Sequence, residues 1–383
     1  MPVRKLRAAL TAILLGTATA GAAALVLAAP AQAATVSAKV GAALKEAQSL
    51  AAAGNYKGAM AKINEAENAP GKTPDDNQII NQMKQFVAVK SGDASIGGAA
   101  GAKAKFANDY NAKKYKDVIA DADLLRKNGA LDGNSQQIIA QAYYLSGDKA
   151  GCVRYIKSNF SAPGDATLEL LMRCAYDNGD DETQRAALET LVGRTGKPEY
   201  WKGLLKLAER SRGLSDHNTL DINRLRLITG NIETKDDYTL LAQLALQLGN
   251  AAEAQSVVEK GQAAKLLTDD RSTRLLNLAK TQAAANAANL QKNIAAAQAQ
   301  PQGDALIKVG EDMIGQGKAK DAIGVIQQGL KKPLKDAANG QLRLGQAQLA
   351  AGQKADAQKT FAGVKAPEKD AMVAHLWNLA ARR

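Results

Sequence analysis

The chain has 383 residues, of which 46% are hydrophobic and only 4% aromatic. Strands are rich in β-branched and aromatic side chains, so this composition favours an all-helical protein whose helices pack through small residues such as Ala. The length exceeds what one compact core supports, which indicates several domains or an elongated array of repeats. The net charge of +12 is spread among interspersed acidic residues. It therefore does not indicate a nucleic-acid partner.

The N-terminus has the pattern of an export signal. Arg4, Lys5 and Arg7 precede an uncharged apolar stretch at residues 8–29, and Ala31 and Ala33 form the small-x-small pattern that signal peptidase cuts. We predict that residues 1–33 are a cleavable signal peptide, cut after Ala33, and that the mature protein is periplasmic or secreted. The alternative is an uncleaved anchor, because about 20 apolar residues can span a bilayer. We expect no integral membrane span after cleavage.

A short phrase centred on Gly recurs along the chain. From Gly147 onward it returns at Gly179, Gly249, Gly317 and Gly352, with separations of 32, 70, 68 and 35 residues. The two long gaps each equal two periods of about 34 residues, which is the spacing of a helical repeat. Weaker members fall where the period requires them, at Gly213, at Lys113 and near residues 281–283. The period is broken only between about residues 70 and 105.

Amphipathic segments of about a dozen residues flank each Gly. Before Gly352, for example, apolar residues occur at Leu342, Leu344, Ala347 and Leu349. Apolar positions at helical spacing on both sides of a Gly turn predict a helical hairpin. One hairpin cannot bury both of its apolar faces, so we expect neighbouring hairpins to stack as an α-solenoid.

This helix-turn-helix unit resembles the tetratricopeptide repeat (TPR). The units that resemble it best carry a small residue in the first helix, a Gly turn, an Ala early in the second helix, a bulky residue one turn later and a closing Pro. One unit has Gly345, Gly352, Ala357, Phe361 and Pro367; others have Gly310, Gly317, Ala322, Ile326 and Pro333, or Ala47, Gly54, Ala59, Ile63 and Pro70. The resemblance implies an all-α superhelix of about eight TPR-like repeats with a concave inner face.

The predicted organisation follows from this phase. After the signal peptide we expect a first repeat at residues 34–70, an irregular helical insert at 71–105, central repeats at 106–300, and C-terminal repeats with a terminal helix at 301–383. The Gly-rich segment at residues 97–103 does not have the spacing of a phosphate-binding loop, and we predict that it is a linker.

No group of residues indicates an enzyme, a cofactor or a metal site. The two histidines, His217 and His375, lie 158 residues apart and form no spaced ligand pair. Cys152 is predicted early in a second helix and Cys174 late in the next first helix. Antiparallel packing would bring them within disulfide distance in an oxidising compartment. Two small residues of the core are the equal alternative.

The resemblance to TPR proteins implies a non-catalytic scaffold or adaptor that binds an envelope protein through its concave face. Tyr, Trp and Arg are enriched among residues that dominate interfaces, and this singles out candidates on the first helices of the middle units: Gln136, Gln137, Tyr143, Tyr144, Arg173, Tyr176 and Trp201. Two alternatives remain open. The positive charge, which signal removal lowers to +9, could contact an anionic envelope polymer or lipid surface, or the array could be the accessory arm of a cell-wall enzyme.

Overall fold

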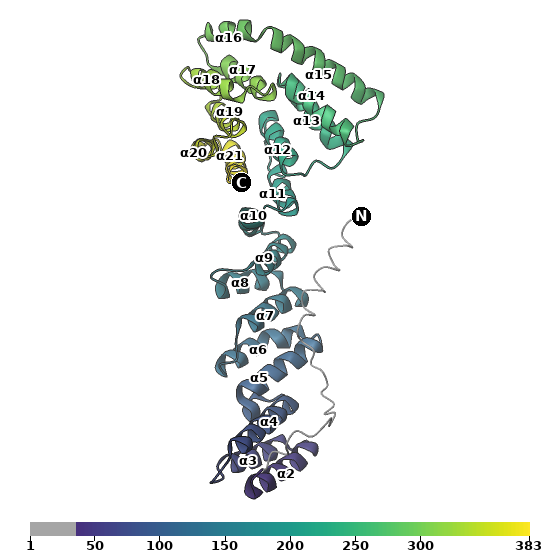
Figure 1. Cartoon of the computed structure of the whole chain (residues 1–383), viewed down its shortest axis with the longest axis vertical. Coiled ribbons are helices and arrows are strands. Elements are labelled where there is room, and N and C mark those ends of the chain that lie inside the picture. Colours follow the sequence, from purple (N-terminus) through teal and green to yellow (C-terminus); the bar gives the residue numbers. More distant parts are fainter. Residues whose placement is uncertain (1–35) are drawn as a thin grey trace. The chain divides into compact units, whose positions relative to one another are not determined.

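The computed structural model describes residues 36–383, so the predicted signal peptide lies outside the described residues. All regular elements in this range are helices, α2 to α21 (Figure 1). They belong to two compact units, residues 36–132 and 133–383. None of these helices is long and apolar enough to cross a membrane. The predicted all-α solenoid class is confirmed, because successive helices pack against their neighbours along the chain.

The N-terminal unit, residues 36–132, contains five helices. They are α2 (Ala38–Ala52), α3 (Tyr56–Glu67), α4 (Pro74–Ser91), α5 (Ala94–Asn111) and α6 (Tyr115–Lys127). Thr73 and Asp76 form a capping box that starts α4, with Pro74 in its first turn. Asp76 also accepts a hydrogen bond from the backbone N–H of Ser37 at 2.9 Å, which ties α4 to the start of α2.

The expected break in the repeat has a simple cause. The hairpin α2–α3 turns at Gly54, and the next hairpin in phase is α5–α6, which turns at Lys113 with φ 58°. One additional helix, α4, lies between them and shifts the phase. Residues 71–105 hold α4 and the first part of α5, with positive φ at Gly71 and Gly92 outside these helices and at Gly98, where φ 51° interrupts α5. Residues 97–103 lie inside α5, so the prediction of a linker there is wrong.

The C-terminal unit, residues 133–383, contains the remaining helices. They are α7 (Gly133–Ser146), α8 (Lys149–Asn159), α9 (Asp165–Asn178), α10 (Asp181–Thr195), α11 (Pro198–Glu209), α12 (Asp216–Ile228), α13 (Lys235–Gln247), α14 (Ala251–Ala263), α15 (Asp270–Ala288), α16 (Leu290–Gln298), α17 (Asp304–Gly315), α18 (Ala319–Leu330), α19 (Ala337–Ala350), α20 (Lys354–Gly363) and α21 (Glu368–Ala381). The described residues thus hold 20 helices. Twenty helices would fill ten two-helix units, so the prediction of about eight repeats is too low.

The predicted turn near residues 281–283 does not exist. Those residues lie in the interior of α15, which runs for 19 residues to Ala288. α16 then continues beyond the end of α15 instead of folding back along it (Figure 1). The other predicted turns have a residue with positive φ, such as Gly147 at 93°, whereas no residue of this segment adopts positive φ. Without such a residue the first helix is not stopped.

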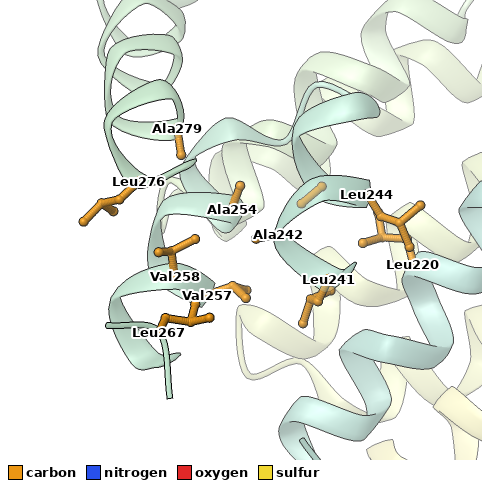
Figure 2. Packing of buried hydrophobic residues seen from close by; sticks show 11 residues of the cluster. Leu220, Leu241, Ala242, Leu244, Ala254, Val257, Val258, Leu267, Leu276 and Ala279 are labelled. Atoms are coloured by element: carbon orange, nitrogen blue, oxygen red, sulfur yellow. The ribbon is translucent and has the colours of Figure 1, made fainter. Parts of the chain in front are cut away.

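The pairing of small with bulky residues in the C-terminal hairpins matches the expected pattern. Gly310 lies against Ile326 and Gly345 against Phe361, and a Cβ added at either glycine would lie 2.4 Å from those side chains. Small residues therefore permit the close approach of α17 to α18 and of α19 to α20. A further apolar core is built from the four successive helices α12, α13, α14 and α15. It contains side chains such as Leu220, Leu241 and Val257 (Figure 2).

The C-terminal unit is not a simple linear stack. α17 packs against α14, and the last helix, α21, returns to pack against α12 and α10 (Figure 1). Polar contacts accompany this return: Asn218 Nδ2 donates to Asp370 Oδ1 at 2.8 Å, and His375 Nε2 lies 3.2 Å from Glu189 Oε2. Helices distant in the sequence are thus neighbours in this unit.

Candidate functional site

Four of the predicted contact residues share one face of the first helices α7 and α9. Gln137 and Tyr144 are seven residues apart on α7, and Arg173 and Tyr176 are three apart on α9, so each pair projects from one side of its helix. The structure packs α7 against α9. We call Gln137, Tyr144, Arg173 and Tyr176 the tyrosine face. Tyr176 is its most accessible aromatic residue, with 55% of its surface exposed.

Tyr144 joins the two helices of this face through cations. The Nζ atom of Lys149 lies 3.3 Å from the centre of the Tyr144 ring, and the Arg173 guanidinium carbon lies 5.8 Å from it. A cation over a tyrosine ring stabilises an exposed contact by about 0.5–1 kcal/mol. Burial and a hydrogen bond with Asp177 raise the pKa of the Tyr144 hydroxyl. The hydroxyl is therefore protonated at neutral pH.

A further hydrogen bond connects α9 to α11. The Tyr200 hydroxyl donates to Glu169, which lies one turn before Arg173 on α9. Burial and the nearby Glu169 carboxylate raise the pKa of Tyr200, so this hydroxyl also keeps its proton. The first helices α7, α9 and α11 are thereby connected by polar and aromatic contacts in addition to their buried side chains.

Three of the predicted surface residues have other roles. Trp201 is only 2% exposed, so its prediction as a partner-binding residue is wrong. Its neighbours Leu204, Leu205 and Ala208 are also buried, and this apolar spacing already indicated a core helix face. Tyr143 packs on the Tyr155 ring of α8 with 5.4 Å between centroids. Gln136, seven residues earlier, lies on that same half-buried side of α7.

The two cysteines are joined by a disulfide. Cys152 of α8 and Cys174 of α9 have Cα atoms 6.1 Å apart, and both side chains are fully buried. The bond links the second helix of one hairpin to the first helix of the next. Because Cys174 directly follows Arg173, the disulfide fixes the position of the tyrosine face on α9 relative to α8.

No sequence pattern indicated the cluster of charged residues in the core. In the C-terminal unit Arg224 and Arg343 contact the carboxylates of Asp221, Glu253 and Glu311, which we call the arginine cluster. Arg343 and Asp221 are fully buried. The Arg343 Nη1 atom donates to Asp221 Oδ1 and to Glu311 Oε1, both at 2.7 Å. The cluster joins α12, α14, α17 and α19.

The two arginines of the arginine cluster keep Glu311 ionised. Burial opposes ionisation of Glu311, but the charges of Arg343 and Arg224 outweigh burial and lower its pKa to about 2. Burial likewise opposes the charge on Arg224, while Glu253 and Glu311 raise its pKa well above the usual value. Because every charge faces an opposite charge, the cluster is structural rather than a store of an ionisable catalytic group.

The histidines are not brought together. His217 lies at the start of α12 and His375 on α21 contacts Glu189. Within residues 36–383 no group of His, Cys, Asp and Glu has the arrangement of a metal site.

No protein-family model matches the chain, and no curated protein matches it in sequence. The function must therefore be argued from the faces and clefts of the structure itself.

Proposed function

We propose that the protein is a non-catalytic adaptor of the bacterial cell envelope that binds a segment of a partner protein on the tyrosine face. The observation that carries the proposal is the exposure of Tyr176 beside Arg173 and Tyr144. Tyr and Arg dominate binding energies where a partner desolvates them, and here they lie together on neighbouring helices. Leu145 on α7, which is 48% exposed, adds apolar surface to the first helices.

The order of this face supports the proposal. The disulfide holds α9 on α8, and the Tyr144 ring of α7 contacts Lys149 of α8 and Arg173 of α9, so the exposed side chains are displayed on a rigid frame. A preformed surface loses less conformational entropy on binding than a mobile one. The export signal predicted at residues 1–33 supports an envelope location, where the disulfide would persist.

Site-specific photocrosslinking in cells tests the proposal. A photoreactive phenylalanine analogue replaces Tyr176 in the full chain, and the matched control carries it at Arg154, which is exposed on the second helix α8. We expect a discrete protein adduct at position 176 that the control does not form and that Arg173→Ala diminishes. Equal adducts at both positions, or none at 176, would refute the tyrosine face as the binding site.

Salt distinguishes the alternative of an anionic polymer or lipid surface. If the protein instead binds such a surface through its positive charge, association should collapse when the ionic strength rises from about 0.1 to 0.5 M. Capture of one protein on an aromatic face should change little over that range, because its apolar contacts are not screened.

A further inference from the structure

A small cleft in the C-terminal unit lies next to the arginine cluster. Its volume is about 270 Å³, and its lining comes from α12, the end of α13, α17 and the start of α19. The charged or polar residues that matter are His217, Asp304, Lys308, Glu311, Asp336 and Asn339. Sites for drug-sized ligands usually exceed 300 Å³, so this cleft suits a smaller molecule.

The cleft holds charges of both signs that do not pair with one another. Asp304 and Lys308 are four residues apart on α17, a spacing at which Asp and Lys commonly pair on a helix. Within residues 36–383 neither of them, nor Asp336, forms an ion pair. The surrounding chain separates them. The Asp304 carboxylate accepts from the backbone N–H of Lys335 at 3.1 Å, and the Lys308 side chain lies across Gly249.

Two carboxylates therefore lie near each other in the lining of the cleft. Asp304 binds the backbone of Lys335, the residue directly before Asp336, whose own carboxylate caps α19 through the N–H of Asn339 at 2.8 Å. Each of these hydrogen bonds is to a neutral N–H, so neither carboxylate is neutralised by a cation. The lining of the cleft thus carries these two negative charges and the single ammonium group of Lys308.

The floor of the cleft supplies further polar atoms. Glu311 is 3% exposed, and the arginine cluster engages its Oε1 atom while Oε2 takes part in none of those bonds. The Nδ1 atom of His217 is buried and has no hydrogen-bond partner. A buried polar atom without a hydrogen-bond partner is unfavourable, and a polar ligand that reaches it from the cleft would satisfy it.

We propose that this cleft binds a small zwitterion, a free amino acid or a dipeptide, with its ammonium group between Asp304 and Asp336 and its carboxylate on Lys308. This ligand is small enough for the cleft, and it supplies a positive group for the two carboxylates and a negative group for Lys308. The inference is independent of the tyrosine face, which lies on α7 and α9, and either can fail without the other.

Calorimetry and thermal unfolding of the full chain test this site. Both tryptophans, Trp201 and Trp377, are buried in the C-terminal unit, so tryptophan emission follows that unit alone. The probes are glycine, L-alanine, L-glutamate, L-lysine and L-alanyl-L-alanine at about 10 mM. A probe with a Kd of about 1 mM should raise the Tm of the C-terminal unit by about 3 °C. A response to the dipeptide alone distinguishes it from the free amino acids as the source.

Analogues and variants then test the two charged ends. The N-acetyl derivative of the best probe lacks the ammonium group and its amide lacks the carboxylate, so both should bind at least tenfold more weakly. Lys308→Met and Asp336→Asn should do the same to the parent probe, since Asn still caps α19. Lys320→Met and Asp356→Asn, which change exposed residues outside the cleft, are the matched controls.

The proposal is supported if the parent probe binds, if both analogues bind more weakly, and if both cleft variants bind the parent probe more weakly. The two control variants should bind it as the unchanged protein does. No heat and no Tm change with any probe overturns it. It is also overturned if the amide binds as well as the parent, because Lys308 would then have no carboxylate to hold. Each variant must retain the Tm of the unliganded parent within about 2 °C, so that lost binding is not lost folding.

Discussion

Replacement of Arg343 by Met should destabilise the C-terminal unit strongly. Met fills most of the same volume but removes the bonds to Asp221 and Glu311, both of which are at most 3% exposed. Removing one partner from a buried ion pair costs 3–5 kcal/mol, because the remaining charge is left in a dry environment. Arg224 still contacts both carboxylates, so we expect the low end of this range, about 3 kcal/mol. For a unit of this size that lowers Tm by about 6–12 °C.

Urea unfolding followed by tryptophan emission measures this effect in the C-terminal unit, because both tryptophans lie there. Arg274→Met is the matched control, since Arg274 is exposed on α15, and it should cost less than about 0.5 kcal/mol. Adding Asp221→Asn to Arg343→Met should cost less than the sum of the two single changes, because the stranded charge is removed with its partner. Equal midpoints for Arg343→Met and the control would show that the buried ion pairs of Arg343 do not stabilise the unit.

Three further predictions follow from single groups. Glu311 has a pKa of about 2 in the folded protein against an ordinary 4.5, so its ionisation stabilises the fold fully above pH 4.5. This contribution is lost as the pH falls from 4.5 toward 2. The urea midpoint measured by tryptophan emission should therefore fall over that pH range, and it should fall less in Arg343→Met. The paired change Cys152→Ala and Cys174→Ala should lower the unfolding free energy by about 3 kcal/mol, since the disulfide closes a loop of 22 residues. An unchanged urea midpoint would show that the disulfide does not stabilise the unit. Lys113→Gly should stabilise the N-terminal unit by about 0.5 kcal/mol, because Lys113 adopts φ 58°, and a lower midpoint by circular dichroism would contradict this.

The turns could be predicted from the sequence because their cause is local. A residue with positive φ commonly ends a helix, and Gly is the residue that adopts it at least cost. Gly147, Gly213 and Gly352 all have positive φ, and so does Lys113, which only the period identified. Near residues 281–283 the period predicted a turn without any such residue, and there α15 continues instead.

The arginine cluster and the cleft could not be predicted in the same way. Arg343 reaches Asp221 across 122 residues, and no local pattern distinguishes this buried Arg from the exposed Lys residues of the neighbouring helices. The burial of Arg343 depends on which helix faces meet once α17 packs against α14. The packing of the whole unit determines that arrangement. The prediction that Trp201 lies on the binding surface is wrong for a related reason, because Trp is frequent both in interfaces and in cores.

The two units should differ in how they unfold. In a linear stack each helix contacts only its near neighbours, so stability is a sum of local terms and the ends can fray. The N-terminal unit has contacts of this kind only. In the C-terminal unit α21 packs on α12, α17 packs on α14, and the arginine cluster joins four helices distant in the sequence. These long-range contacts should make α12, α17 and α21 lose hydrogen-exchange protection together at one denaturant concentration, whereas α2 and α3 should lose theirs first. Stepwise loss from α21 toward α12 would show that the return of the last helix does not close the unit cooperatively.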